Sequence, residues 1–454
     1  MDRASAHASL HRGRSGIVVL LAALLGGCAS YAPAPLDRGI VAGADMALLS
    51  RDAAAIDRPF LKPANIDLNA PLDDNAIAVL AVLGNPDLRA LRVRAGISDA
   101  QAFAARLLPD PTFSLGGDHI LSGPDPVDAI ASTLGFDLNA LRTKKVVRAQ
   151  SEAQAKQVRL DLAWSEWQTA GQARIQAARI RGLERGAGDQ KASAEAARRM
   201  LDRTLRAAGR GDLAADAVQG ARTAAFDAED RARTAERDLA AARLELTKLL
   251  GLPPETMLRI GAGPARDTAI DSVHLTEIAI ARRADLEALR AGYDAQENAV
   301  HKAILDQFPT LALNIALQRD TGQNVLLGPT VDFTLPLWNR NRGGIAVERA
   351  TRAALKAEYE SRQFQTRADI AAAASGIMVA RHQRDAIVAD MPSLEKFAAA
   401  SRRAADRGDL APATAEAAEG ALRDKRVALA AADQAIDEQM IALELLTGAP
   451  KEDW

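Results

Sequence analysis

The sequence contains one cysteine and six scattered histidines, so side chains that bind transition metals are scarce. No His-Glu-x-x-His pattern occurs, and no histidine has a cysteine partner with which to form a zinc site. A single cysteine also excludes an internal disulfide bond. The histidines are His7, His11, His119, His274, His301 and His382. These absences predict a protein with no metal and no cofactor.

The chain also lacks the motifs of common enzymes and of nucleic-acid-binding proteins. There is no glycine-rich phosphate loop and no Gly-x-Ser-x-Gly nucleophile elbow. The net charge is −2, which provides no attraction to nucleic acid. Aromatic residues make up only 4%, whereas alanine is abundant, a composition that favours long, closely packed helices over an enzyme core. We therefore predict that the protein is not an enzyme and binds no nucleic acid.

The N-terminal segment has the pattern of an export signal. Three arginines precede the apolar run Ile17–Leu25, which is too short to span a bilayer. The run ends in Leu25-Gly26-Gly27-Cys28, which resembles the lipobox of bacterial lipoproteins, where cleavage leaves the cysteine as a lipid-bearing N-terminus. We expect a signal peptide over residues 1–27 and lipidation of Cys28; the alternative is an ordinary signal peptide with an incidental cysteine. Ala29 is compatible with the outer membrane, because an aspartate there favours the inner one in enterobacterial lipoproteins.

Residues 28–72 are rich in proline, alanine and aspartate. Repeated prolines disfavour helix and sheet hydrogen bonding, so this composition predicts an extended strap that follows the lipid anchor.

Four stretches alternate apolar and polar residues, as strands with one apolar face do. They are Thr112–Leu121, Ser132–Leu141, Thr310–Gln318 and Thr330–Leu335. Helices of the same chain could cover the apolar faces, as in a small soluble sheet. Lipid could cover them instead, since transmembrane barrels use strands of about ten residues with this alternation. Four strands cannot close a barrel, because the smallest has about eight, so several chains would have to share one.

An internal repeat organises the rest of the chain. Asp87-Leu88-x-Ala90-Leu91-Arg92 returns 198 residues later as Asp285-Leu286-x-Ala288-Leu289-Arg290. Arg210-Gly211-Asp212-Leu213-Ala214 returns 197 residues later, beginning at Arg407. Anchors this far apart with nearly one offset indicate a duplicated unit.

The first repeat is assigned to residues 73–260 and begins with a helix over 73–108 that is ended by prolines. Two of the strands follow, and then a long helical hairpin with helices over 143–208 and 213–250 and a turn at 210–213. A linker over 261–273 leads to the second repeat.

The second repeat, residues 274–450, has the same order of elements. A helix over 274–307 precedes two strands and a hairpin with helices over 345–407 and 410–446, which reverses at residues 407–410. Pro392 lies within the first of these helices and predicts a kink or a break there. A tail over 451–454 closes the chain.

The residues around the third and fourth strands resemble the TolC family, the outer-membrane factors of Gram-negative efflux pumps. The resemblance is carried by Phe308-Pro309-Thr310 and by Thr330-Val-Asp-Phe-Thr-Leu-Pro-Leu-Trp-Asn-Arg-Asn-Arg-Gly-Gly-Ile345. Asn85-Pro-Asp-Leu-Arg-Ala and Leu108-Pro-Asp-Pro-Thr-Phe-Ser-Leu-Gly116 are the first-copy equivalents. The resemblance covers residues 73–450 and includes the duplication, and the lipobox matches the lipoprotein branch of the family.

The resemblance implies a mainly α fold with a small β part, assembled as a homotrimer. Each chain would give four strands to a twelve-stranded transmembrane barrel and its helical hairpins to a periplasmic α-barrel tunnel. The apolar residues of the strands would then face outer-membrane lipid: Phe113, Leu115, Phe136, Leu138, Leu311, Leu313, Ile315, Val331 and Phe333. The polar positions would face water: Asp118, Asp137, Asn139, Asn314 and Asp332.

The resemblance further implies that the two helix turns form the periplasmic tip, where the periplasmic adaptor (membrane fusion) protein of an inner-membrane transporter docks. The tip residues are Gly211, Asp212, Leu213, Gly408, Asp409 and Leu410. Glycine supplies the positive φ of a tight reversal, and the two aspartates would cap the returning helices. The alternative is turn chemistry with no contact role.

The chain departs from the family in the acidic ring that narrows the tunnel entrance. Family members often carry acids about six and nine positions after the tip glycine, where this chain has Ala217, Gly220, Thr414 and Ala417. Asp216, Glu416 and Glu419 lie close by but out of register.

We therefore expect a lipid-anchored outer-membrane channel of a tripartite efflux or export system, a passive conduit with no catalytic residues. The alternative is a periplasmic coiled-coil lipoprotein that acts as a scaffold or adaptor and buries its strands in a soluble domain. A wide tube makes few specific contacts with the molecules that pass through it, so metal ions, drugs and peptides are all compatible as exported substrates.

Overall fold

The computed structural model describes residues 31–454, except residues 38, 40–42, 44–45, 125–126 and 264–268. The chain divides into two units, Met1–Ala42 and Gly43–Trp454. The described residues of the first unit have no regular secondary structure. The expected signal peptide and Cys28 lie outside the described residues.

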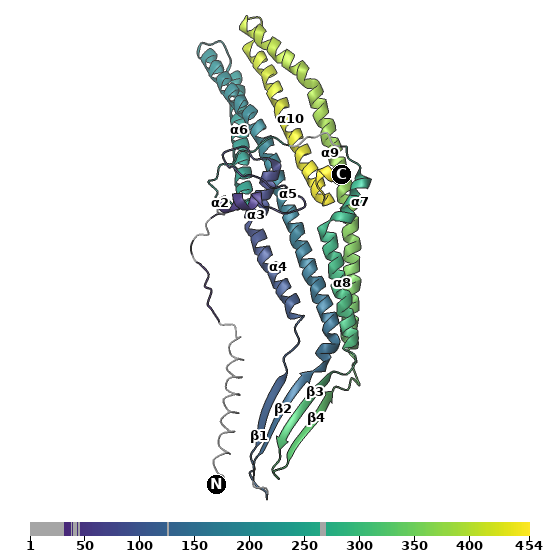
Figure 1. Cartoon of the computed structure of the whole chain (residues 1–454). Coiled ribbons are helices and arrows are strands. Elements are labelled where there is room, and N and C mark those ends of the chain that lie inside the picture. The colour runs from purple at the N-terminus through teal and green to yellow at the C-terminus, as the bar shows by residue number, and fades with distance from the viewer. Residues whose placement is uncertain (1–30, 38, 40–42, 44–45, 125–126, 264–268) are drawn as a thin grey trace. The chain divides into compact units, whose positions relative to one another are not determined.

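The second unit repeats one order of elements (Figure 1). After α2 (Met46–Ala54), the first series is α3 (Asp74–Gly84), α4 (Pro86–Ala104), β1 (Thr112–Asp118), β2 (Ala129–Asp137), α5 (Leu138–Gly209) and α6 (Ala215–Leu249). The second series is α7 (Ser272–Arg282), α8 (Ala284–Leu305), β3 (Leu311–Arg319), β4 (Val325–Phe333), α9 (Arg342–Asp406), α10 (Pro412–Thr447) and η1 (Lys451–Asp453). The fold is therefore mostly helical with a small sheet, and its two series match the two sequence repeats.

The strands form one antiparallel sheet in the order β1-β2-β3-β4. The register pairs Phe113 with Leu134, and Leu134 with Ile315. Phe136 pairs with Leu313, which pairs with Val331. Because side chains of paired residues lie on the same face of a sheet, the register gathers the apolar residues of all four strands on one face.

Two strands differ from the sequence prediction at their ends. The second strand ends at Asp137, because the Asp137 carboxylate accepts hydrogen bonds from the backbone N–H groups of Asn139 and Ala140 and caps α5. Leu138 and Asn139 therefore belong to a helix rather than to a strand face. The fourth strand begins at Val325 and not at Thr330, since Val325 pairs with Arg319.

The observed bounds of the first and third strands also differ from the predicted ones, by fewer residues. The first strand ends at Asp118 rather than at Leu121, because its pairing with β2 stops at Ala129. The third strand starts and ends one residue later than expected.

Each short helix predicted as continuous is two helices in the structure. The first breaks at Asn85, because the proline that follows it, Pro86, disfavours a helical conformation at Asn85. The second breaks at Arg283, which has φ −64° and ψ 121° without a following proline. Both break residues donate to a carbonyl near the end of their repeat's last helix: Asn85 Nδ2 to Leu249 O (2.9 Å) and Arg283 Nη1 to Leu446 O (3.0 Å).

The long helices run from the sheet to the helix turns (Figure 1). At 1.5 Å per residue, the 72 residues of α5 extend roughly 110 Å. The sequence predicted a kink or a break at Pro392; a break does not occur, since α9 is one helix from Arg342 to Asp406. Val388, whose carbonyl the missing proline N–H leaves free, lies on an exposed part of the helix where water can bind it.

Two apolar cores hold the short helices against the long ones. In the first, α3 residues such as Ile77 and Leu80 pack against Ile180 of α5 and Leu246 of α6. In the second, Leu275 of α7 packs among residues of α9 and α10. None of the described helices combines the length and the apolarity that a membrane-crossing helix needs.

Candidate functional site

The apolar face of the sheet is uncovered in the single chain. Phe113 and Leu115 are 69% and 70% exposed, and Val331 is 53% exposed. Phe136, Leu311, Ile315 and Phe333 are exposed as well, and Leu313 is half-buried. No helix packs over these side chains in the described part of the chain: the only substantial helix–strand contact is that of α5 with β3. The soluble sheet buried beneath its own helices, the alternative open at sequence level, is thus not what the structure shows.

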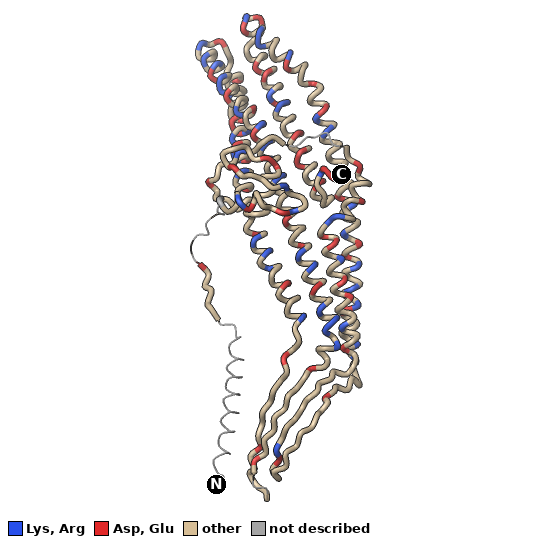
Figure 2. The backbone as a smooth tube through the Cα atoms, viewed as in Figure 1, with Lys and Arg blue, Asp and Glu red and all other residues tan. Residues whose placement is uncertain are grey.

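The opposite face of the sheet is polar. Asn314 Nδ2 donates to Asp332 Oδ2 (2.5 Å), and Gly135 lies between the side chains of Asn314 and Thr112. The strands carry few charged residues compared with the helices (Figure 2). One face suited to lipid and one suited to water is the arrangement of a barrel wall.

The sheet also has two free edges. Strands β1 and β4 each pair on one side only among the described residues. A strand with unpaired N–H and C=O groups pairs readily with another chain. The sheet therefore has both an uncovered apolar face and two edges that can pair with a further strand.

The two helix turns have one geometry. Gly211 and Gly408 have φ values of +85° and +84°, which only glycine adopts easily. In the first turn, the N–H groups of Gly211 and Asp212 donate to the carbonyls of Ala208 and Ala207, the Schellman pattern. Gly408 and Asp409 donate in the same way to Ala405 and Ala404.

The aspartates of the turns do not cap the returning helices as expected. Helices α6 and α10 have no side-chain cap hydrogen bond. Asp212 instead accepts from Arg210 Nε at 2.9 Å, and Asp409 accepts from Arg407 Nε at 2.9 Å. The aspartate follows glycine directly, two residues before the cap position, so its carboxylate reaches the preceding arginine. Leu213 is exposed beside the turn and Leu410 is half-buried.

The three acids proposed for the entrance differ in their surroundings. Asp216 is exposed in the first turn of α6 and has no basic partner among the described residues. Glu416 and Glu419 both pair with Arg423, at 2.5 and 3.7 Å, and Glu419 also pairs with Arg402 of α9. Arg423 further donates to Ser193 of α5. These arginines were not identified from the sequence. Glu419 and Arg423 have the i, i+4 spacing of a helix pair and could have been recognised, whereas Arg402 lies on α9 and no local pattern links it to Glu419.

Two buried clusters of charged residues were also not predicted from the sequence. Glu166 of α5, only 4% exposed, accepts from Arg58 of the strap at 2.6 Å and from Arg92 of α4 at 2.7 Å. Burial alone would raise the pKa of Glu166, but the hydrogen bonds from Arg58 and Arg92 outweigh it and hold the pKa below its ordinary value. This cluster fixes the strap and α4 to the long helix.

The second cluster lies at the break between α7 and α8. Arg283 forms a bidentate pair with Asp285 at 2.7 and 2.9 Å, and Arg362 of α9 lies 3.5 Å from the same carboxylate. The Arg283 guanidinium also stacks 4.6 Å from the ring of Trp164 in α5, a cation–π contact between the two repeats.

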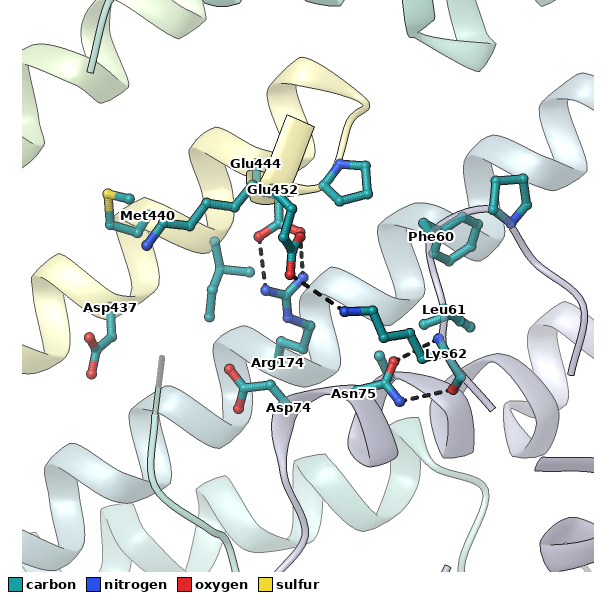
Figure 3. Close-up of a pocket in the computed structure, with 15 residues that line it drawn as sticks. Phe60, Leu61, Lys62, Asp74, Asn75, Arg174, Asp437, Met440, Glu444 and Glu452 are labelled. Carbon is teal, nitrogen blue, oxygen red and sulfur yellow. Dashed lines mark hydrogen bonds and ion pairs between the residues drawn. The ribbon is translucent and has the colours of Figure 1, made fainter. Parts of the chain in front are cut away.

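A cavity lies between α3, α5, α10 and η1 (Figure 3). Arg174 of α5 reaches across it to Glu444 of α10 with two 2.8 Å hydrogen bonds. Burial would lower the pKa of Arg174, but the Glu444 carboxylate raises it. Lys62 contacts Asn75 and Glu452 at the rim. The charged groups that line this cavity pair chiefly with one another, so it joins the two repeats rather than presenting reactive groups.

The second repeat matches a known family. Residues 275–449 match the outer membrane efflux protein family. No curated protein sequence matches the chain.

Several solved structures have a similar fold. The CmeC outer membrane channel of Campylobacter jejuni aligns over 93% of this chain and 95% of its own, with 14% identity and a TM-score of 0.69. The outer membrane protein VceC of Vibrio cholerae covers 83% and 96%, with 15% identity and a TM-score of 0.67. The outer-membrane channel OprN covers 92% and 99%, with 17% identity and a TM-score of 0.70. The likeness spans both repeats and shows a shared fold.

Proposed function

We propose that this chain is an outer membrane efflux protein, the channel component of an efflux system, and that three copies of it form one continuous passive conduit. Each copy contributes four strands to a twelve-stranded barrel in the outer membrane and two helical hairpins to a tunnel in the periplasm. An inner-membrane transporter supplies the energy, and the conduit itself carries out no catalysis.

The observation that carries the proposal is the exposed apolar face of a four-stranded sheet with two free edges. A single copy leaves its edge hydrogen bonds unmade, which costs several kcal/mol per group in lipid. Pairing of β1 with β4 of a neighbouring copy satisfies both edges and closes the wall. The apolar face then meets acyl chains, and the face with Asn314 and Asp332 lines the water-filled interior.

Adjacent residues of β1 test the two faces with matched charges. We expect Leu115→Arg, on the apolar face, to prevent formation of stable trimers in membranes, since an arginine at the bilayer midplane costs about 2–4 kcal/mol on a barrel's lipid face. Ser114→Arg, on the polar face, is expected to leave the trimer intact and to change the ion selectivity of the channel. Gel mobility without heating and planar-bilayer conductance are the measurements. Equal effects of the two variants, or a monomeric wild type in mild detergent, would refute the proposal.

The two Schellman turns are proposed as the docking site of the periplasmic adaptor. They are matched in geometry, exposed, and placed at the ends of the long helices. A photo-crosslinking amino acid at Leu213 should capture a periplasmic adaptor in cells. The same group at Leu244, an exposed position near the other end of α6, should not. Capture from both positions, or from neither, would count against docking at the turns.

Lipidation of Cys28 is proposed from the sequence alone. Wild-type protein should incorporate radiolabelled palmitate, and Cys28→Ser should not. Incorporation into the variant would rule out the anchor.

A further inference from the structure

An apolar slot lies at the helix end of the sheet's apolar face. It is lined by Leu108, Pro109, Pro111, Phe136, Leu138, Leu141 and Leu313, with Asp137 at its edge. Phe136 and Leu313 are paired residues on the apolar face, so the slot opens on the side that meets lipid. A separate cavity with Asp137, Asn139, Thr310 and Asp332 marks the polar face at the same end.

Basic residues follow the slot along helix α5. Lys145 lies four residues after Leu141 and Arg148 seven residues after it, so the three share one stripe of the helix. Lys144 lies on the neighbouring side of the same turn. Lys145 is exposed and Lys144 is half-buried, and neither has an acidic partner among the described residues. The stripe therefore changes from apolar to cationic within about 6 Å along the helix axis.

Two acids near this stripe on α5 are already engaged. Glu152 lies between Arg148 and Arg106, at 2.9 Å from each. The hydrogen bond from Arg148 lowers the pKa of Glu152, with a smaller contribution from Arg106. Asp137 caps the N-terminus of α5. Arg142, on the same turn as the lysines, donates to the Pro309 carbonyl and to Asn139 Oδ1. The cations of this turn that have no protein partner among the described residues are therefore Lys144 and Lys145.

We propose that the slot and the two lysines bind one anionic phospholipid of the periplasmic leaflet. An acyl chain lies in the slot against Leu141 and Phe136, and the phosphate lies one helical turn further from the sheet, beside Lys145 and Lys144. This polarity, chains toward the strands and headgroup toward the helices, is that of a lipid in the leaflet nearer the helices. Charge complementarity selects an anionic headgroup over a zwitterionic one. The proposal rests on membrane insertion of the sheet but not on adaptor docking or conduction.

Native mass spectrometry of the delipidated full-length protein tests the site. Phosphatidylglycerol and phosphatidylcholine with identical acyl chains are titrated separately. We expect tighter binding of phosphatidylglycerol to the wild type. Lys144→Gln/Lys145→Gln should weaken that binding by roughly thirtyfold, to the level of phosphatidylcholine. Leu141→Glu should weaken both lipids, because it places a carboxylate in the slot.

The matched control is Lys191→Gln/Arg203→Gln, which removes two exposed charges from the same helix, roughly 70 Å and 90 Å from the site. It should bind both lipids as the wild type does. Equal loss of phosphatidylglycerol from the control would show a general basic surface and overturn the site. So would unchanged binding by the lysine variant.

Two further outcomes would contradict the choice of ligand. Displacement of phosphatidylglycerol by inorganic phosphate would mean that the lysines bind a free anion. Binding that appears only in Cys28→Ser would mean that the chain's own lipid fills the slot. Trimer mass and bilayer conductance, measured on the same samples, separate loss of the lipid site from failure of the proposed channel: a conducting trimer without lipid preference rejects the site alone.

Discussion

The two repeats break their short helices at equivalent positions with different chemistry. In the first, Asn85 caps α4 and binds the Leu249 carbonyl through one short side chain. In the second, Arg283 binds the equivalent Leu446 carbonyl and also pairs with Asp285 and stacks on Trp164. The backbone geometry is shared, but only the second break reaches into the other repeat. The duplicated fold therefore requires a side chain at the break that binds the carbonyl near the end of the last helix, but asparagine and arginine both serve.

The largest expected effect comes from the first repeat's charge cluster. Glu166→Gln leaves Arg58 and Arg92 without their shared carboxylate, and we expect a loss of about 3–5 kcal/mol, as for a broken buried ion pair. Asp285→Asn in the second repeat should cost less if Trp164 still holds Arg283. Thermal unfolding in detergent measures both, and a larger loss for Asp285→Asn would reverse the comparison.

Glu166 also predicts a pH dependence. Its folded-state pKa lies below the ordinary value of 4.5, so its contribution to stability is complete above that pH. The contribution is lost as the pH falls through the lowered pKa. Wild-type protein should therefore lose more stability on acidification below about pH 4.5 than Glu166→Gln does. Parallel pH profiles of the two proteins would contradict this assignment.

The glycines that follow the last helix of each repeat, Gly251 and Gly448, provide a second comparison of the two repeats. Gly251 and Gly448 have φ values of +66° and +67°. A Cβ on Gly251 would collide with the backbone carbonyl of Gly84, whereas one on Gly448 would meet Arg283, in part its flexible side chain. We expect Gly251→Ala to lower stability by about 3 kcal/mol or more and Gly448→Ala by about 1–2 kcal/mol. Denaturant titration measures the difference, and equal losses would show that the Arg283 side chain cannot move aside.

The turn glycines should behave alike. Gly211 and Gly408 share their positive φ, and a Cβ on either has no atom within 4 Å. Each Ala variant should cost about 1 kcal/mol and leave the trimer intact. Hydrogen exchange at the turns measures the local loss of protection. Unequal losses would show that the two turns are not equivalent in the assembly.

The smallest effect is expected at the tunnel entrance. If Asp216 is the free acid there, Asp216→Asn should lower cation selectivity modestly. Glu416→Gln should change selectivity less, because Arg423 already neutralises that carboxylate. Reversal potentials across a bilayer in a salt gradient distinguish the two variants. A larger shift of the reversal potential for Glu416→Gln than for Asp216→Asn would show that Asp216 is not the free acid at the entrance.

Alternation predicted the faces of the sheet, because a period of two depends on side chains alone. It did not predict the strand ends. The second strand stops where the Asp137 carboxylate binds the next helix, and the fourth begins in Val325-Leu326-Leu327, where polar residues no longer alternate. The break at Asn85 was visible in Pro86, but the break at Arg283 has no local signal and depends on a carbonyl 163 residues away. Glu166 was missed for the same reason, since its partners Arg58 and Arg92 are distant in sequence. The pair of Glu419 and Arg423 is four residues apart on α10, so this one could have been recognised from the sequence.

The unpaired edges of β1 and β4 have a consequence for the life of the protein before assembly. A newly exported copy crosses the aqueous periplasm with an exposed apolar sheet whose two edge strands have no partner strand. On the proposed trimeric assembly, its lifetime there depends on how quickly it meets a chaperone or two further copies, so a low concentration of the chain should favour its degradation over its insertion into the membrane.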